Sequence, residues 1–215
     1  MIIAIEGLDG AGKNTLTTRL VARLTGVGRS VATLAYPRYE ARPLGPALRG
    51  LLTGDAGLAA VAAQPRATAM MFALDRAASR PELDALLAEH DVVLLDRYVA
   101  SNAAYGAARL AEPERAAFQS WIADLELGSL ALPVPDLQVL LRIEVDRARA
   151  DASARADGDP GRPRDTFEAD DGLQARCAHM YEDLAARSWL SPWLVVDRET
   201  GVDAVDGWLT AASAH

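Results

Sequence analysis

The opening stretch of the chain, MIIAIEGLDGAGKNT, constrains the fold more than any other part of the sequence. An apolar run at residues 2–5 leads into a glycine-rich turn, then Lys13, then a helical pattern. A continuous apolar run is typical of a strand buried on both faces of a parallel sheet. The glycines allow successive backbone N–H groups to point at an anion, and the helix N-terminus adds a partial positive charge. The order of strand, glycine turn and helix therefore predicts a phosphate-binding loop.

We expect this loop to hold nucleotide phosphates, with Lys13 reaching the outer ones. The phosphate-binding residues predicted from the pattern are Gly7, Asp9, Gly10, Ala11, Gly12, Lys13, Asn14 and Thr15. Asn14 stands where the usual pattern has a hydroxyl for the metal, and Thr15 follows it. The departure leaves open how the loop holds Mg²⁺. A glycine turn that only ends a strand is the alternative, and the flanking strand and helix argue against it.

Composition limits the classes of protein to which the chain can belong. Its 215 residues, half of them apolar, fit one domain over residues 1–215 with a sizeable core. A formal net charge of −8 makes a nucleic-acid partner a poor expectation. The single cysteine, Cys177, excludes an internal disulfide and favours a reducing compartment. With no signal peptide and no membrane-spanning apolar run in the sequence, we expect a cytoplasmic protein without a membrane partner.

Hydrophobic periodicity predicts strands that alternate with helices. Strands are expected at 2–5, 30–35, 91–96, 137–141 and 193–196. Helices are expected at 13–24, at a short segment before residue 57, at 64–90 with a break near Pro81, and at 100–110, 114–130, 146–155, 168–189 and 202–212, with a loop at 157–164. This order predicts an α/β fold of the P-loop NTPase type, in which a five-stranded parallel sheet has helices on both faces.

In such sheets ligands bind outside the carboxyl ends of the strands. This rule brings the phosphate-binding loop, the loop at residues 36–39 and the segment after Asp96 to one edge of the sheet. Asp96 ends an apolar strand, as does the carboxylate that helps to hold Mg²⁺ in P-loop enzymes. The alternative is an aspartate that caps the next helix.

Several short motifs, taken together, resemble thymidylate kinases. They are the loop G-x-D-G-A-G-K with Asp9, the run Tyr36-Pro37-Arg38-Tyr39, the helix motif at residues 72–76, the sequence Asp96-Arg97-Tyr98 followed by Ser101 and Ala104-Tyr105, and a lid at 159–168. They occur in the family's order from Met1 to about Glu168. The hydroxyl of Thr15 follows a variable residue, and this also resembles the loop sequence of nucleoside monophosphate kinases.

The resemblance implies a pocket for thymine and deoxyribose. Phe72 would stack on the pyrimidine, Arg76 would donate to a thymine carbonyl, and the Asn102 amide would pair with the base edge. Tyr105 would lie beside the sugar and disfavour a 2′-hydroxyl. By themselves, Phe72 and Tyr105 also suit core positions, Arg76 a surface ion pair and Asn102 a helix cap. The full expected substrate-binding set is Tyr36, Arg38, Tyr39, Phe72, Arg76, Arg97, Ser101, Asn102 and Tyr105.

The resemblance also assigns residues to the phosphates. Arg97 and Tyr39 would hold the monophosphate, with Arg38 nearby, because a guanidinium matches phosphate geometry. A surface arginine is the alternative for Arg97. Asp9 would meet the sugar hydroxyl or a metal-bound water; the alternative is an exposed loop aspartate.

A lid at about 155–168 would close over ATP and place arginines on the transferring phosphoryl group. Because Asn14 is neutral, Arg155 and Arg162, with Arg164, are expected to supply the cation, as in the family's basic-lid bacterial type. Without the other motifs, the same segment would suit a solvated surface loop. Asp165 and Glu168 would help to bind metal or close the lid, or would serve only as helix-start carboxylates. The expected metal set is Asp9, Asp96, Asp165 and Glu168.

These expectations define an enzyme that transfers the γ-phosphoryl group of Mg·ATP to dTMP, giving dTDP for dTTP biosynthesis. The expected catalytic residues are Lys13, Arg97, Asp9, Arg155 and Arg162. Mg²⁺ is the expected cofactor, and the resemblance implies a homodimer. Two alternatives stay open: a P-loop kinase for another small acceptor, and a nucleotide-dependent switch. The second lacks an Asn-Lys-x-Asp guanine motif after the fourth predicted strand.

Overall fold

The centre of the protein is a five-stranded sheet in the order β2-β3-β1-β4-β5, with every pair of neighbours parallel. The structure, a computed structural model, describes residues 1–158, 166–167 and 170–212. The strands are β1 (Ile2–Glu6), β2 (Val31–Ala35), β3 (Val92–Asp96), β4 (Leu137–Leu141) and β5 (Trp193–Val196). The predicted strands and the predicted five-stranded parallel sheet are therefore confirmed, with strand ends correct to within one residue.

The central strands are buried on both faces because successive side chains enter two different cores. In β1, Ile2 and Ala4 pack into one hydrophobic cluster, whereas Ile3 and Ile5 pack into the other. Residues of β3 alternate between the same two clusters. A continuous apolar run in the sequence is thus the local signature of a strand covered by helices on both sides.

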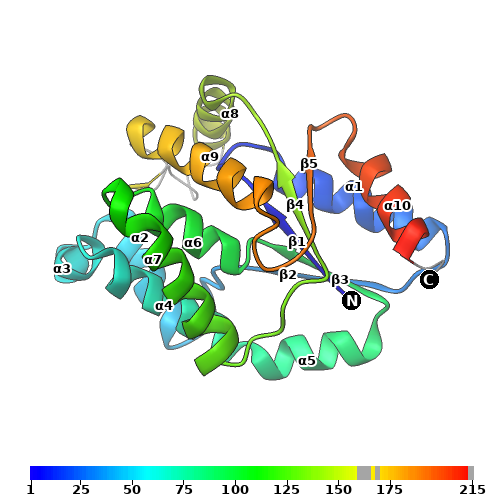
Figure 1. Cartoon of the computed structure of the whole chain (residues 1–215), viewed down its shortest axis with the longest axis horizontal. Helices are drawn as coiled ribbons and strands as arrows, with labels where there is room; N and C mark the ends of the chain where they lie inside the picture. The colour runs from blue at the N-terminus through cyan, green and yellow to red at the C-terminus, as the bar shows by residue number, and fades with distance from the viewer. Residues whose placement is uncertain (159–165, 168–169, 213–215) are drawn as a thin grey trace.

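Helices cover the two faces unequally (Figure 1). On one face, α1 (Lys13–Gly26) packs against α10 (Gly201–Ala212) and the second cluster. The other face carries most of the helices, and α6 contacts α4, α7 and α9. Their bounds are α4 (Pro65–Ala78), α5 (Arg80–Glu89), α6 (Val99–Ala107), α7 (Glu112–Ala123) and α9 (Asp171–Ala186). The face that carries more helices therefore holds the elements that follow β2 and β3, at the edge of the sheet where the site was predicted.

Of three helical segments, one has the predicted break and the other two differ in detail from the prediction. The expected break near Pro81 is confirmed, because α4 ends at Ala78 and α5 begins at Arg80 with Pro81 in its first turn. The helix expected at 114–130 begins earlier, and its last part is the π-helical segment η2 (Asp124–Ser129). The short helix expected before residue 57 is α2 (Leu44–Thr53), followed by η1 (Ala56–Leu58) and α3 (Ala59–Ala62).

The region of the predicted lid is described only in part. Helix α8 (Val145–Gly158) extends beyond the predicted end at Arg155, so the expected loop start at residue 157 was wrong. Helix α9 begins at Asp171, where the Asp170 side chain accepts a hydrogen bond from the Leu173 N–H and caps the first turn. The predicted lid residues Arg162, Arg164, Asp165 and Glu168 lie outside the described residues, as does the side chain of Arg155.

Among the helices in the described part of the chain, none combines the length and apolar character needed to cross a membrane.

Candidate active site

A pocket of about 990 Å³ lies beside the carboxyl ends of β1, β2 and β3. Most of the predicted site residues line it: Asp9, Gly10, Gly12, Lys13, Asn14, Thr15, Tyr36, Tyr39, Phe72, Arg76, Asp96, Arg97, Ser101, Asn102 and Tyr105. Of the predicted residues outside the lid segment 155–168, Gly7, Ala11 and Arg38 do not line it. The structure therefore brings the predicted phosphate and base residues to one cavity.

The phosphate-binding loop has the backbone that its glycines permit. Gly10 and Gly12 adopt φ values of 79° and 98°, in the region that favours glycine. A Cβ on Gly10 would lie 2.1 Å from the carbonyl oxygen of Ala148, so α8 packs directly on the loop. Lys13 is almost fully buried, and its Nζ donates to the carbonyl oxygens of Gly7 at 3.2 Å and Leu8 at 2.9 Å. Burial and the nearby Arg97 charge lower the pKa of Lys13.

Arg198 is a cation at this loop that the sequence did not indicate. Its Nε donates to the carbonyl oxygen of Ala11 at 2.7 Å, and its Nη2 donates to that of Gly10 at 2.5 Å. The same guanidinium pairs with Asp151 of α8 at 2.6 Å and lines the pocket. Arg198 follows the last strand in no recognisable motif, so only the three-dimensional arrangement reveals its position against the loop.

Arg97 links the loop to the segment after β3. Its Nη2 lies 2.5 Å from Oδ1 of Asp9, and its Nη1 donates to Gly7, Ser101 and Tyr181 at 3.1, 3.2 and 3.3 Å. Burial opposes the charge of Asp9, but the charges of Arg97 and Lys13 outweigh it and hold the pKa of Asp9 below its usual value. The alternatives of a surface arginine and an exposed loop aspartate are therefore wrong, since the side chains of Arg97 and Asp9 are 14% and 21% exposed.

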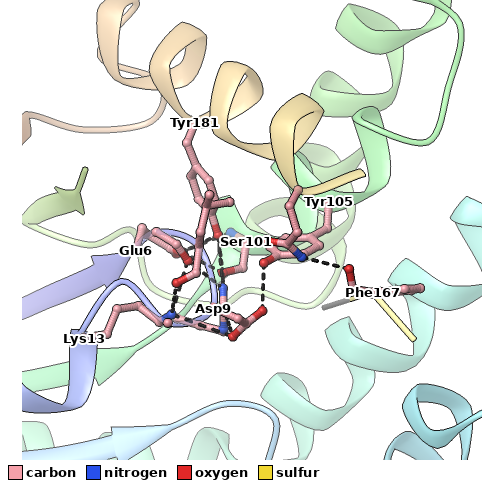
Figure 2. Close-up of polar contacts among 12 residues, drawn as sticks. Glu6, Asp9, Lys13, Ser101, Tyr105, Phe167 and Tyr181 are labelled. Carbon is pink, nitrogen blue, oxygen red and sulfur yellow. Dashed lines mark hydrogen bonds and ion pairs between the residues drawn. The ribbon is translucent and has the colours of Figure 1, made fainter. Parts of the chain in front are cut away.

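Tyr105 completes this cluster from α6. Its hydroxyl donates to Oδ2 of Asp9 at 2.9 Å, and the guanidinium carbon of Arg97 lies 5.4 Å from its ring centre (Figure 2). Phe167 stacks on Tyr105, with ring centres 6.3 Å apart. The N–H of Thr166 donates to the carbonyl oxygen of Leu52 at 2.8 Å. The end of the predicted lid thus contacts the residue expected beside the sugar, a role for Phe167 that sequence reasoning missed.

A buried carboxylate at the end of β1 supports the same cluster. Glu6 accepts hydrogen bonds from the Tyr98 N–H at 2.8 Å, the Ser101 hydroxyl at 2.6 Å and the Tyr181 hydroxyl at 3.1 Å (Figure 2). Burial raises the pKa of Glu6, although these donors and Arg97 oppose that effect. Glu6 therefore holds the first turn of α6, which carries Ser101, against the loop. Neither Glu6 nor Tyr181 was predicted as a site residue.

The far end of the pocket is built around a buried ion pair. Arg76 of α4 donates from Nε and Nη2 to the two carboxylate oxygens of Glu126 at 2.5 and 2.8 Å. Asn102 of α6 donates from Nδ2 to Ala69 at 2.9 Å and to Glu126 at 2.8 Å. All three side chains are buried or nearly so. The alternatives of a surface ion pair for Arg76 and a helix cap for Asn102 are therefore wrong, whereas Phe72 is half-buried and lines the pocket.

Asp96 carries a buried carboxylate oxygen, Oδ1, that has no hydrogen-bond partner among the described residues. It does not cap α6, because the N-cap residue there is Tyr98. The described residues contain no group of three or more metal-binding side chains. One free carboxylate oxygen beside a phosphate loop nevertheless suits Mg²⁺, which is often bound through one or two carboxylates, waters and substrate phosphates. Asp9, by contrast, already has both oxygens bonded to Arg97 and Tyr105.

The loop after β2 places its three predicted residues, Tyr36, Arg38 and Tyr39, differently. Arg38 donates from Nε to Asp75 at 3.2 Å and from Nη1 to Glu82 at 3.2 Å, so it ties the loop to α4 and α5. Tyr39 lines the pocket, with the Arg49 guanidinium 5.1 Å from its ring centre. Tyr36 is buried and bonds through its hydroxyl to Ser79 at 2.6 Å. Tyr39 and Tyr36 therefore reach the cavity that Arg38 does not line.

A phosphate-binding loop after β1, a carboxylate at the end of β3 and one pocket that extends from this loop to Phe72 define a P-loop nucleotide kinase. The family model described as thymidylate kinase matches residues 5–205. The chain belongs to the thymidylate kinase family, whose members use ATP, and its reaction is the phosphorylation of dTMP to dTDP.

Similar proteins agree with this membership. A thymidylate kinase of Mycobacterium tuberculosis (strain H37Rv) is 45% identical over 214 residues, which cover 100% of this chain and 97% of that protein. A thymidylate kinase of Bifidobacterium longum (strain NCC 2705) is 33% identical over 95% of this chain and 93% of its own length. A solved thymidylate kinase structure from Candida albicans superposes with a TM-score of 0.71 at 20% identity, covering 98% of this chain and 89% of that one. The structural likeness supports the fold.

Proposed function

We propose that the chain transfers the γ-phosphoryl group of ATP directly and in line to a phosphate oxygen of dTMP, with Mg²⁺ as cofactor. The observation that carries this proposal is the shared pocket, whose lining includes the loop around Lys13 together with Arg97, Tyr105, Arg76 and Asn102. Positioning two anions and neutralising their charge supplies most of the catalysis in phosphoryl transfer. No covalent intermediate on the enzyme is required.

Each phosphate group has its own residues in this proposal. The backbone N–H groups of the loop and the Lys13 ammonium bind the β- and γ-phosphates of ATP. Arg97 and Tyr39 bind the monophosphate of dTMP, and Arg38 supports the loop that carries Tyr39 through its bonds to Asp75. Because Arg97 pairs with Asp9 without a ligand, the incoming phosphate shares or replaces that carboxylate as a partner. This exchange avoids leaving a buried cation uncompensated.

The free oxygen of Asp96 supports a role for this residue in holding Mg²⁺, together with the phosphates. When bound, Mg²⁺ neutralises charge that develops on the transferring group. Asp9, Asp165 and Glu168 stay further predicted members of the metal site. The neutral Asn14 in the loop supports the basic-lid type, in which Arg155 and Arg162 reach the transferring phosphoryl group from the lid at about 155–168.

The proposal extends to the assembly and setting of the protein. Residues 1–215 act as one kinase domain, and two copies form a homodimer, as the family resemblance implies. A buried free thiol at Cys177 supports a reducing, cytoplasmic setting. The formal net charge of −8 supports the absence of a nucleic-acid partner, and the proposal includes no membrane partner. Light scattering tests the homodimer, and a mass equal to one chain would contradict it.

The in-line route has a direct test. ATP made chiral at the γ-phosphorus by sulfur and oxygen isotopes is incubated with dTMP and the protein, and the configuration of the product is determined. A single displacement inverts the configuration, so we expect inversion. Retention would show two displacements and a covalent phosphoenzyme, and would contradict the proposal. The same product analysis shows whether the labelled group reaches dTMP.

A further inference from the structure

Glu126 is a fully buried carboxylate that no part of the proposed mechanism uses. It lies in the π-helical segment η2, which contacts α4, and its carboxylate also bonds Asn102 of α6. Arg76 donates to both of its oxygens, and Asn102 donates to one of them. Single-turn π-helical segments inside helices are frequent at functional sites. The side chain therefore joins the two residues that face the predicted base.

The hydrogen bonds of Asn102 fix which way its amide points. Both acceptors around Nδ2, the carbonyl oxygen of Ala69 and the carboxylate of Glu126, can only accept. A flipped amide would place Oδ1 of Asn102 against these two oxygens. Three buried acceptor atoms would then face one another with no hydrogen atom between them to form a hydrogen bond. The NH₂ group must therefore face the protein. Asn102 lines the pocket. Its Oδ1 forms no hydrogen bond with the described residues.

Arg76 is oriented by the same carboxylate. Its Nε and Nη2 are engaged in the two-point contact with Glu126, and its Nη1 has no hydrogen bond to the part of the chain that the structure describes. Arg76 also lines the pocket. The base end of the cavity therefore offers an acceptor from Asn102 and a donor from Arg76, both set by one buried side chain.

We propose that Glu126 is a positioning residue that makes the pocket select thymine or uracil over cytosine. Thymine has a donor at N3–H next to a carbonyl, and these match the Asn102 acceptor and the Arg76 donor. Cytosine has an unprotonated N3 and an amino group at C4, so it would face the acceptor with an acceptor and the donor with a donor. A site built to bond one pattern rejects the other strongly, because its buried groups stay unpaired. This inference rests on the proposed function and names the residue that fixes base choice within it.

The variant Glu126→Gln tests the role of the carboxylate with almost no change in volume. The amide that this substitution introduces can donate to Oδ1 of a flipped Asn102, so only the contact with the Ala69 carbonyl oxygen still opposes that orientation. We expect the ratio of kcat/KM for dCMP to that for dTMP to rise at least about tenfold, mainly through KM. We expect kcat at saturating dTMP and KM for ATP to stay within about threefold, since neither phosphate site is altered.

A matched control is Gln119→Glu on the preceding helix α7. It replaces an amide by a carboxylate, the reverse of the change in Glu126→Gln. Gln119 accepts a hydrogen bond from Arg187 and does not line the pocket, so the base ratio should stay at the parent value. A folded Glu126→Gln protein with the parent ratio would overturn the inference. A parent protein that does not phosphorylate dTMP would instead overturn the proposed function, which keeps the two failures distinct.

Loss of the charge beside Arg76 can destabilise Glu126→Gln, so circular dichroism and thermal unfolding accompany the assay. If that variant does not fold, Glu126→Asp retains the charge but is one methylene shorter, and it should raise the same ratio.

The parent protein supplies a measurement that needs no variant. N3-methyl-dTMP, which lacks the N3–H donor, should lose at least about tenfold in kcat/KM against dTMP. Equal values for the two compounds would overturn the inference.

Discussion

Nη2 of Arg97 lies 2.5 Å from Oδ1 of Asp9, and this contact joins the two halves of the active site. Asp9 belongs to the loop after β1, and Arg97 follows β3, the neighbouring strand in which Asp96 pairs with Ile5. The backbone of Arg97 has φ of 65°, a left-handed conformation that is uncommon for a residue with a side chain. Such strain persists where the surroundings hold the residue for a purpose. Here it aims the guanidinium at the phosphate-binding loop.

Arg97→Ala should reduce kcat by at least about 100-fold, because a charge-assisted donor that positions the acceptor phosphate of dTMP is lost. Steady-state kinetics with Mg·ATP and dTMP measures the effect, and circular dichroism checks the fold. Near-normal turnover by the folded variant would contradict the assigned role.

The strain at Arg97 gives a second, independent prediction. Arg97→Gly removes the same side chain but relieves the left-handed backbone, so it should be about 1 kcal/mol more stable than Arg97→Ala. Urea unfolding of the two variants measures the difference. Equal stability, or a more stable alanine variant, would show that the backbone stores no strain at this position.

Tyr105 should determine the choice between deoxyribose and ribose through its ring. Tyr105→Ala is expected to raise the kcat/KM of ribothymidine monophosphate relative to dTMP by about tenfold, since it opens space beside the sugar. Tyr105→Phe is the control, because it keeps the ring and removes only the hydroxyl bonded to Asp9. Kinetics with both nucleotides separates the variants. A similar change of ratio in both would assign the selectivity to the hydroxyl instead.

Phe72→Ala should raise KM for dTMP by about tenfold or more and leave KM for ATP nearly unchanged, because it removes the surface on which the pyrimidine stacks. Leu74→Ala on the same helix is the control, since Leu74 is 40% exposed and does not line the pocket. The two KM values are measured for each protein. Equal effects on both substrates would identify Phe72 as a packing residue.

Asp9 should make stability depend on pH in acid. Because its pKa is lowered in the folded protein from an ordinary value of 3.8, the ionised carboxylate stabilises the fold above that value. The stabilisation falls as pH drops below 3.8 toward the folded pKa. The difference in unfolding free energy between the parent and Asp9→Asn should therefore be greatest near neutral pH and shrink in acid. Urea unfolding from neutral pH to about pH 2 measures it, and a constant difference would contradict the assigned ion pair.

Local pattern was sufficient for the framework of the site. Each local feature indicates the structure of its own segment. This holds for the apolar runs of β1 and β3, the glycines before Lys13 and the carboxylate that ends β3. Physical rules for parallel sheets then place those ends at one edge. The fold and the meeting of Lys13 with the segment after Asp96 were therefore predictable from local pattern, whereas Tyr105 was assigned to the site only by the resemblance to thymidylate kinases.

The supporting contacts were not predictable in the same way. Glu126 meets Arg76 across 50 residues of sequence, and Glu6 meets Tyr181 across 175 residues. Neither carboxylate belongs to a recognisable spacing, and the helical period does not reveal a π-helical turn. The end of α8 was also misjudged, because the acidic and glycine-containing sequence after Arg155 favours a loop when its packing is unknown. These features depend on tertiary contacts.

The central claim is that this one pocket phosphorylates dTMP. The most direct measurement is ADP formation from Mg·ATP with equal concentrations of dTMP, dUMP, ribothymidine monophosphate, dCMP, AMP and thymidine. The account predicts rapid turnover with dTMP, weaker turnover with dUMP and little with ribothymidine monophosphate, dCMP, AMP or thymidine. Faster turnover with AMP, thymidine or the ribonucleotide than with dTMP would contradict it.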